Sequence, residues 1–361
     1  MNVGLTESRS DESVTRSRGS SGGGRHRVSI VDVASRAEVS VATVSRALRG
    51  MPNVSRGTRE RVLRAAEELE YTASPLAAGL VTGRIRSVGV VTRYAGRWFF
   101  AEVVRGIEEA LRAGGYDLVL YMVGDPGRRA AFFAELPLRR RVDAVLLVGL
   151  PLDTQELSVL RALNVPLACV GEPLPEVHAE RIDNVAASRM AAQHLINLGH
   201  RRIAMIGGSV EESREDGVPG QRARGFREAL RDSGVEVRPE WERDGGFTTR
   251  GGELAMTDLL SSAGGRPTGV FCQSDETVFG ALRALRRSGL RCPEDVSVVG
   301  FDDHELAETF DVTTIAQPVA AQGAAAARWL VERLEGRGGE PATCVHDVRL
   351  VLRGSTGPAR A

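Results

Sequence analysis

One short stretch near the N-terminus carries side chains of the kinds that contact DNA. Thr43, Ser45 and Arg46 are spaced so that an α-helix turns them outward, while Val44 falls on the opposite, apolar face. Arginine can donate two parallel hydrogen bonds to a guanine edge, and short hydroxyl side chains reach phosphate oxygens. Ser40 stands where the N-cap of this helix would lie. The pattern predicts a recognition helix, although the periodicity alone also fits any helical hairpin with a solvated face.

A second set of polar side chains follows apolar runs in the C-terminal half. Ser274 and Asp275 come soon after the run 269–272, and Asp302 follows the run 296–300. In an open α/β sheet, ligands bind in the crevice outside the carboxyl ends of the strands. These residues are therefore candidates for a ligand site, with helix N-capping as the alternative role of Ser274 and Asp275.

Aromatic and basic residues follow an earlier apolar run of the same kind. Trp98, Phe99 and Phe100 lie where a loop meets a helix, and Arg93 and Arg97 precede them. Aromatic faces stack on the apolar face of a sugar ring, and arginines favour anionic or phosphorylated ligands. The alternatives are packing in the core for the aromatic residues and solvation for the arginines.

The elements that must position these residues follow from hydrophobic periodicity. From residue 88 onward, short Val/Ile/Leu runs alternate with amphipathic segments, which is typical of βαβ units with a parallel sheet buried on both faces. Two such series, divided near residue 184, predict two similar lobes with a ligand between them. The expected strands are Ser87–Thr92, Asp117–Val123, Ala144–Val148, Leu167–Val170, Ile203–Ile206, Gly269–Cys272 and Val296–Gly300. The expected helices include Phe100–Ala113, Ala186–Leu198, Gly220–Ser233, Thr249–Ser262, Glu276–Arg287 and Gln322–Leu334.

Residues 28–80 show short helical patterns instead. The segment 28–48 predicts two helices around a tight turn, and a third helix runs from Ser55 to about Leu69 with apolar residues three and four apart. Together they form a small helix-turn-helix bundle.

Composition and charge narrow the class of protein. With 361 residues, 42% of them hydrophobic, the chain is long enough for two or three domains. No apolar run approaches the roughly eighteen residues of a membrane span, and residues 1–27 lack the apolar core of a secretion signal. We therefore expect a disordered N-terminal tail and a cytoplasmic protein. Residues 1–86 hold 14 arginines against nine acidic residues although the whole chain is neutral, which predicts a polyanionic partner for this part.

The sequence offers no pattern for catalysis, a cofactor or a metal. The four cysteines Cys169, Cys272, Cys292 and Cys344 have no C-x-x-C spacing and are expected to be buried, small hydrophobic residues. The six histidines are scattered. Glycine-rich nucleotide motifs, the G-x-S-x-G elbow and H-E-x-x-H are absent. We therefore expect no catalytic residues, no cofactor and no metal site.

Longer motifs run through the chain after residue 27. The N-terminal ones are Ile30-x-Asp32-Val33-Ala34, Val39-Ser40-x-Ala42-Thr43-Val44-Ser45-Arg46, Asn53-Val54-Ser55-x-x-Thr58-Arg59-x-Arg61-Val62 and Leu69-x-Tyr71. Those of the core are Leu198-Gly199-His200-Arg201-Arg202-Ile203-Ala204, Ser274-Asp275, Val298-Val299-Gly300-Phe301-Asp302-Asp303, Thr313-Thr314-Ile315-x-Gln317 and Arg353-Gly354-Ser355-Thr356. With these motifs the chain resembles the LacI/GalR (lactose-repressor and galactose-repressor) family of transcription factors.

The resemblance implies DNA contacts residue by residue. Val41, Ala42 and Arg46 correspond to positions that read base edges in the major groove, where valine and alanine can only make apolar contacts. The short polar side chains correspond to phosphate contacts. The expected DNA-binding residues are Ile30, Val41, Ala42, Thr43, Ser45, Arg46, Asn53, Ser55, Thr58, Ala77 and Leu80.

The resemblance also implies a hinge helix at residues 74–80, which orders on the operator and inserts Leu80 into the minor groove. Composition alone also fits a linker helix that packs on its own protein. Two departures from the family pattern bear on this region. Glu38 replaces the usual glycine in the turn, at a cost of about 1 kcal/mol if φ is positive there. Ala73-Ser74 replaces the usual Pro-Asn, which would weaken folding of the hinge helix.

For the core, the resemblance implies a pair of lobes that bind a small effector and dimerise. Phe247 corresponds to a ligand-stacking aromatic residue, and Arg222 to an arginine that clamps effector hydroxyls or carboxylates, with an interlobe salt bridge as its alternative role. Arg97 and Gly149 stand at contact sites and indicate a distinct effector. The expected effector-binding residues are Arg97, Phe99, Phe100, Gly149, Arg222, Phe247, Ser274, Asp275 and Asp302.

We therefore predict an N-terminal all-α helix-turn-helix headpiece plus an α/β core of two Rossmann-like lobes, periplasmic-binding-protein-like. The expected divisions are a tail (1–27), the DNA-binding domain (28–73), hinge helix and linker (74–86), the core (87–356) and a short tail (357–361). The expected function is repression of carbohydrate uptake or catabolism genes, by a homodimer on a pseudo-palindromic double-stranded DNA operator, under control of a saccharide-like effector. The alternatives are a regulator of this fold that responds to no effector or to a non-sugar, and a solute-binding protein.

Overall fold

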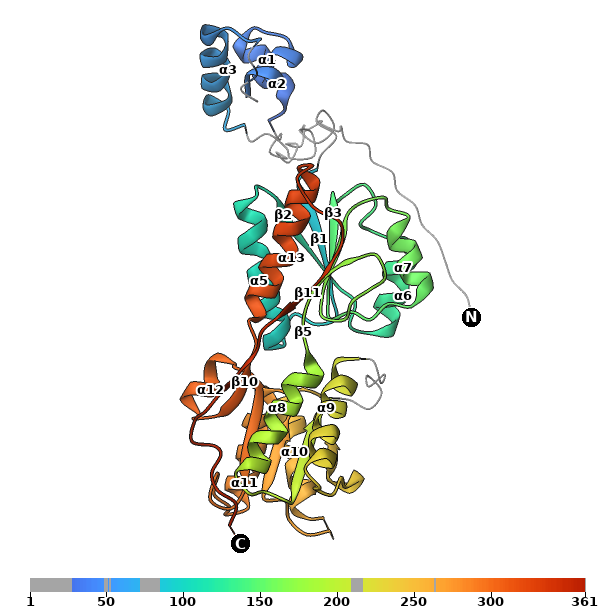
Figure 1. Ribbon diagram of the computed structural model, residues 1–361. Helices are drawn as coiled ribbons and strands as arrows, with labels where there is room; N and C mark the ends of the chain where they lie inside the picture. Colours follow the sequence, from blue (N-terminus) through green and yellow to red (C-terminus); the bar gives the residue numbers. More distant parts are fainter. Residues whose placement is uncertain are drawn as a thin grey trace, which may run out of the picture. The chain divides into compact units, whose positions relative to one another are not determined.

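The computed structural model of this chain describes residues 28–48, 51, 53–71, 85–208, 217–262 and 264–360 (Figure 1). The chain forms two compact units, Met1–Ala78 and Gly79–Ala361. The expected N-terminal tail, the hinge residues Ala77 and Leu80 and most of the expected linker lie outside the described residues. In the described part, no helix combines the length and the apolar character that crossing a bilayer requires.

Three helices build the first unit: α1 (Ile30–Ala37), α2 (Val41–Leu48) and α3 (Arg56–Glu68). A capping box begins α1, because Ser29 Oγ accepts from the Asp32 amide at 3.4 Å and the Asp32 carboxylate accepts from the Ser29 amide at 2.8 Å. The helices enclose a small core that fixes which faces point outward. Its buried members are Val33, Ala34, Ala37, Val44, Ala47, Val62, Ala65 and Ala66.

The turn between α1 and α2 contains a residue in the left-handed region. Glu38, the C-cap of α1, has φ 53° and ψ 46°, and its amide donates to the carbonyl oxygens of Ala34 and Ser35. A side chain with a Cβ atom is strained in this conformation. The positive φ considered from the sequence is thus present.

Replacing Glu38 by glycine is expected to stabilise the first unit by about 1 kcal/mol, because glycine adopts a positive φ without that strain. Hydrogen exchange of the full chain, followed by mass spectrometry, should show slower exchange in peptides from α1–α3. Arg64→Gly is the control, since it removes an exposed arginine from the interior of α3 and should speed exchange there. Unchanged or faster exchange in Glu38→Gly would show that the turn is not strained.

Two six-stranded sheets form the second unit, with strand orders β11-β5-β4-β3-β1-β2 and β12-β10-β9-β8-β6-β7. The first lobe contains β1 (Ser87–Thr92), β2 (Asp117–Met122), β3 (Ala144–Val148), β4 (Leu167–Val170), β5 (His178–Ile182), β11 (Thr343–His346), α5 (Trp98–Ala113), α6 (Pro126–Glu135), α7 (Thr154–Arg161) and α13 (Val319–Leu334). The second lobe contains β6 (Ile203–Gly207), β7 (Glu242–Asp244), β8 (Gly269–Cys272), β9 (Ser297–Asp302), β10 (Thr313–Ala316), β12 (Arg349–Val351), α8 (Asn184–Asn197), α9 (Val218–Asp232), the 3-10 helix η1 (Pro239–Trp241), α10 (Thr249–Leu260), α11 (Asp275–Arg287) and α12 (Glu305–Thr309).

The strands pair in parallel except for β12, which is antiparallel to β10. Every residue of β1, β3, β4, β8 and β9 is buried, which explains why these strands are continuous apolar runs in the sequence. The seven expected strands are confirmed, with ends that differ by two residues or fewer. Five further strands, β5, β7, β10, β11 and β12, were not expected.

The chain passes between the lobes three times. It crosses from β5 into α8 at Asp183, from β10 into α13 at Gln317 and Pro318, and from β11 into β12 at residues 347–348. Figure 1 shows the result, because α13 and β11, coloured red as late segments, lie among the cyan and green elements of the first lobe. The division expected near residue 184 matches the first crossover only.

The four cysteines are free thiols in different environments. Cys169 and Cys272 are buried as expected, whereas Cys292 is half-buried and Cys344 is exposed. The expectation was wrong for these two because Cys292 lies in a loop between α11 and β9, and Cys344 lies on an edge strand.

Candidate nucleic-acid interface and ligand pocket

Helix α2 presents the predicted base-reading residues to solvent. Val41 is 41% exposed, and Ala42 and Arg46 are exposed beside it. The orientation of α2 is fixed from the other side, where Val44 lies in the core of the first unit. Ser40 Oγ accepts a hydrogen bond from the Thr43 amide at 3.2 Å, so the predicted N-cap is present.

Most of the candidate phosphate-contacting residues lie at the starts of α2 and α3. Ser55 caps α3, accepting from the Thr58 amide at 3.2 Å, and Asn53 is exposed just before it. Thr43 and Ser45 on α2 are half-buried. Helix N-termini attract phosphate, because their first amides point outward and carry a partial positive charge. Ile30 differs from this group, since it is half-buried against the core of the first unit.

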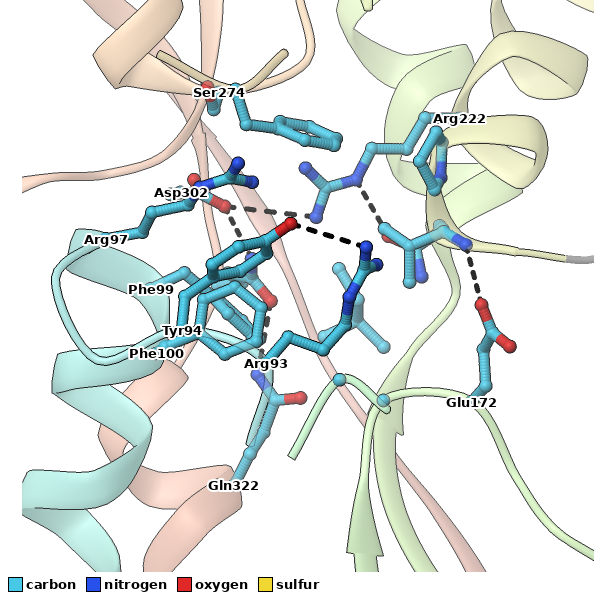
Figure 2. Close-up of a pocket in the computed structure, with 18 of the residues that line it drawn as sticks. Arg93, Tyr94, Arg97, Phe99, Phe100, Glu172, Arg222, Ser274, Asp302 and Gln322 are labelled. Carbon is cyan, nitrogen blue, oxygen red and sulfur yellow. Dashed lines mark hydrogen bonds and ion pairs between the residues drawn. The ribbon is translucent and has the colours of Figure 1, made fainter. Parts of the chain in front are cut away.

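The second unit contains a cavity of about 130 Å³ between its lobes (Figure 2). In the first lobe it is lined by residues that follow strand ends, with Arg93 after β1, Gly149 after β3 and Gly171 after β4. In the second lobe, Ser274 follows β8 and Asp302 ends β9. The cavity therefore occupies the crevice at the carboxyl ends of both sets of parallel strands.

Arg222, from α9, is held at the back of the cavity by its own lobe. Its Nε donates to Asn184 Oδ1 at 2.9 Å and its Nη1 to the Gln273 carbonyl oxygen at 2.5 Å. The guanidinium carbon lies 3.6 Å from the centroid of the Phe301 ring. Nη2 faces Asp302 Oδ1 at 3.9 Å (Figure 2). Because both residues belong to the second lobe, the alternative of an interlobe salt bridge is wrong.

Burial dominates the electrostatics of this pair. It lowers the pKa of Arg222 to about 10, against the opposing effect of the Asp302 charge. Burial likewise raises the pKa of Asp302 to about 6, despite Arg222 and a hydrogen bond from Gln317 Nε2 at 2.6 Å. Both charged groups line the cavity. A ligand hydroxyl between them can accept from the guanidinium and donate to the carboxylate.

Aromatic rings form the wall that the first lobe contributes. The Tyr94 and Phe100 rings meet edge to face at 5.4 Å, as do the Phe99 and Phe100 rings. The Arg97 guanidinium carbon lies 3.8 Å from the Tyr94 ring centroid. Gly149 makes room for this wall, since a Cβ atom on it would come 2.8 Å from Phe100 Cε1.

Two side chains of the second lobe reach the cavity from strained backbone. Phe247 has φ 53° and Asp302 has φ 111°, values that L-residues rarely adopt. Such conformations cluster at ligand sites, where the surrounding fold enforces them.

The structure brings all but one of the predicted effector-binding residues to the cavity. The exception is Asp275, whose carboxylate accepts from the His304 amide and from Thr314 Oγ1, each at 2.8 Å. Burial raises the pKa of Asp275 well above its usual range. Ser274 lines the cavity and also caps α11 through the Thr277 amide, so its two proposed roles are compatible.

Sequence reasoning missed several polar lining residues. Glu172 and Asn184 flank β5, a strand that the apolar pattern did not reveal, and Gln317 lies in a crossover. Asn184 could have been found from its position, because it lies where a helix was expected to begin, at the predicted division between the lobes. The complete set missed is Tyr94, Glu172, Asn184, Glu276, Gln317 and Gln322.

Direct contacts between the lobes border the cavity. Glu172 Oε1 accepts from the Val218 amide at 3.0 Å (Figure 2). Trp98, at the start of α5, stacks on His304 of the second lobe with ring centroids 4.8 Å apart. The structure therefore shows the cavity with the two lobes in contact at its border.

Two parts of the chain match different family models. The model described as "Bacterial regulatory proteins, lacI family" matches residues 29–74, and the model described as "Periplasmic binding protein-like domain" matches residues 192–356. Over 335 residues the chain is 36% identical to the HTH-type transcriptional repressor CytR of Escherichia coli (strain K12), covering 90% of this chain and 95% of that protein.

Solved structures are similar over nearly the whole chain. One is the transcriptional regulator CelR–cellobiose complex, with 36% identity and a TM-score of 0.68 over 91% of this chain and 100% of that one. Another is the lac repressor dimer bound to operator and the anti-inducer ONPF, with 28% identity and a TM-score of 0.80 over 91% and 99% of the two chains. These likenesses and the two parallel-dominated sheets confirm the predicted fold class.

Proposed function

The chain belongs to the lacI family of bacterial regulatory proteins, and from this premise we propose that it represses transcription as a homodimer on a pseudo-palindromic DNA operator. The observation that carries the proposal is α2, whose exposed Val41, Ala42 and Arg46 stand on a firmly packed helical unit. As a DNA-binding regulator, it acts in the cytoplasm.

The effector that we propose is a saccharide or a sugar derivative. Aromatic rings line one wall of the cavity, and Arg222, Asp302 and Asn184 offer hydrogen-bond partners for hydroxyl groups. Three arginines (Arg93, Arg97, Arg222) face three acidic residues (Glu172, Glu276, Asp302) in the lining. This balance favours a neutral polyol over a phosphorylated ligand. The solved complex of the similar CelR with cellobiose supports the same class.

Effector binding is proposed to act through the lobes. A ligand that contacts both Arg222 of the second lobe and the aromatic wall of the first lobe favours one arrangement of the two lobes. The affinity of the protein for DNA changes with that arrangement. The second candidate is an effector-independent regulator of the same fold. It is distinguished by the absence of any shift in thermal midpoint when candidate ligands are added. A solute-binding protein is disfavoured, since the DNA-binding unit is part of this chain.

Arg46→Ala tests base reading. After selection of a preferred operator from randomised DNA, the variant should lose about 1–3 kcal/mol of discrimination at one base pair, because its bidentate contact is gone. Binding to random DNA should change little. Fluorescence anisotropy at fixed salt measures both.

Arg56→Ala is the matched control for this experiment, since Arg56 is an exposed arginine on α3 paired with Glu60 at 3.0 Å. It should leave the base preference intact. An equal loss of affinity on operator and random DNA in Arg46→Ala would refute base reading by this residue.

A further inference from the structure

Two neighbouring strands of the first lobe carry a cluster of side chains that the effector cavity does not use. His178 and Glu180 lie on β5, and Cys344 and His346 lie on β11. The strands are parallel, with Cys344 opposite Glu180. Alternate residues of a strand share one face, so both pairs project on the same side of the sheet.

Glu180 is the centre of the cluster. Its Oε1 lies 3.0 Å from His178 Nε2, and its Oε2 lies 2.6 Å from His346 Nε2. One ligand atom each of His178, Glu180 and Cys344 lie within 4.8 Å of one another. The side chains of His178 and Glu180 are 5% and 6% exposed, and that of His346 is 22% exposed. Cys344 is exposed, which leaves a path from solvent to the cluster.

We propose that His178, Glu180, Cys344 and His346 form a binding site for Zn²⁺ or a similar late divalent transition metal. Two imidazoles, a thiolate and a carboxylate are the donors that tetrahedral zinc accepts, at about 2.0–2.3 Å from the ion. Three of these residues already lie together, and His346, which contacts Glu180, would be the fourth ligand. A metal-free network is the alternative, in which two histidines flank the Glu180 carboxylate and the Cys344 thiol hydrogen-bonds to it, and the titration below separates the two.

The surroundings already orient the most buried ligand. The His178 ring stacks on Trp329 of α13, with centroids 4.4 Å apart and an interplanar angle of 3°. The Ala342 amide donates to His178 Nδ1 at 3.4 Å, a bond that must be lost when Nε2 coordinates a metal and Nδ1 carries the proton. Fixed ring planes of this kind support metal affinity.

The position of the cluster links it to movement between the lobes. β5 leads directly into the crossover at Asp183, and β11 leads directly into the crossover at residues 347–348. A metal would therefore tie together two of the three segments on which the lobes turn. Ile182 and Asn184, beside the first crossover, line the effector cavity.

The test uses the full chain, freed of metal with a chelator and titrated with Co²⁺ and then Zn²⁺. One equivalent of Co²⁺ should produce the visible bands of tetrahedral cobalt and a thiolate-to-cobalt charge-transfer band in the near ultraviolet. Zn²⁺ should displace it and raise the thermal midpoint of the core. No DNA or effector is needed, so the result does not depend on the proposed function.

Cys344→Ser should abolish the charge-transfer band and weaken Zn²⁺ binding at least about tenfold, and His346→Ala should weaken it similarly. Cys344 is exposed, so its replacement leaves the core packing unchanged. Cys292→Ser is the matched control, because that half-buried thiol lies outside the cluster and donates to the Ser355 carbonyl oxygen. Absence of stoichiometric binding in the wild type, or unchanged binding in both Cys344→Ser and His346→Ala, would overturn the proposal.

Discussion

Arg222→Ala is expected to lower the affinity of the protein for its effector by about a hundredfold or more. The side chain is buried and already held by Asn184 and the Gln273 carbonyl oxygen, so a ligand meets a pre-positioned guanidinium. Two charge-assisted hydrogen bonds lost to the ligand correspond to about 3 kcal/mol or more, and each 1.4 kcal/mol is a factor of ten. DNA binding without effector should persist, giving a repressor that no longer responds.

The measurement begins with thermal unfolding of the full chain in the presence of sugars, sugar phosphates, nucleosides and organic acids. A ligand at a hundred times its dissociation constant adds about 2.7 kcal/mol of stability, which is a plain shift in midpoint. Calorimetric titration of the best ligand then compares wild type with variants. Silence across the whole panel would favour the effector-independent regulator.

Arg224→Ala is the matched control. Arg224 lies two residues further along α9, is exposed and faces Glu228 at 4.0 Å. Its loss should leave effector affinity unchanged. If Arg222→Ala binds the ligand as tightly as Arg224→Ala does, the cavity is not the effector site that we propose.

Asp302→Asn is expected to stabilise the effector-free core at neutral pH by about 2 kcal/mol. Burial raises the pKa of Asp302 to about 6, from 3.8 in the unfolded chain, so the folded state binds the proton more tightly. The contribution of this group to stability is therefore full below about pH 4 and is lost as the pH rises through 6. Asparagine is neutral throughout and still accepts the hydrogen bond from Gln317.

Denaturant unfolding between pH 4 and 8 measures this effect, followed by tryptophan fluorescence because Trp98, Trp241 and Trp329 all lie in the second unit. The advantage of the variant should grow from about pH 4 to about pH 6 and be constant above about pH 7. Effector affinity should fall at the same time, since the carboxylate is lost.

Asp303→Asn is a control of opposite sign. It removes an ion pair with Arg353 at 2.8 Å and should destabilise the core. An Asp302→Asn variant that is less stable than wild type at every pH would show that the carboxylate is not costly in the free protein.

The sequence predicted best the elements whose partners are local. Helices α1, α2 and α3 start at the capping serines Ser29, Ser40 and Ser55, of which Ser40 was predicted as a cap, and apolar spacing within each helix indicated its buried face. Buried strands such as β3 were also predicted, because each is a continuous apolar run that can be recognised within the strand itself. In contrast, β5 reads His-Ala-Glu-Arg-Ile, because two of its inward side chains, His178 and Glu180, are polar and satisfy each other.

The site was predictable to the extent that strand ends identify it. Asp302, Ser274 and the aromatic residues after β1 were found because they follow recognisable strands. Gln317 and Gln322 reach the cavity only because the chain returns to the first lobe, and nothing local records that return. The same holds for the metal cluster, whose two halves are separated by more than 150 residues and meet through the pairing of β5 with β11. For Asp275 the same rule failed. This residue follows a strand, but its carboxylate accepts hydrogen bonds from the His304 amide and Thr314 Oγ1 instead of lining the cavity.

The threefold passage of the chain between the lobes also has a consequence for synthesis on the ribosome. The first lobe begins with β1, yet its core includes Val319, Ala327 and Leu330 of α13, and its edge is closed by β11. The second lobe needs β12, which comes later still. Neither lobe can complete its core until nearly the whole chain has been translated. The helical unit at the N-terminus has its core within residues 33–66, so it is free to fold first, and a nascent chain gains its DNA-binding part before the lobes that we propose to control it.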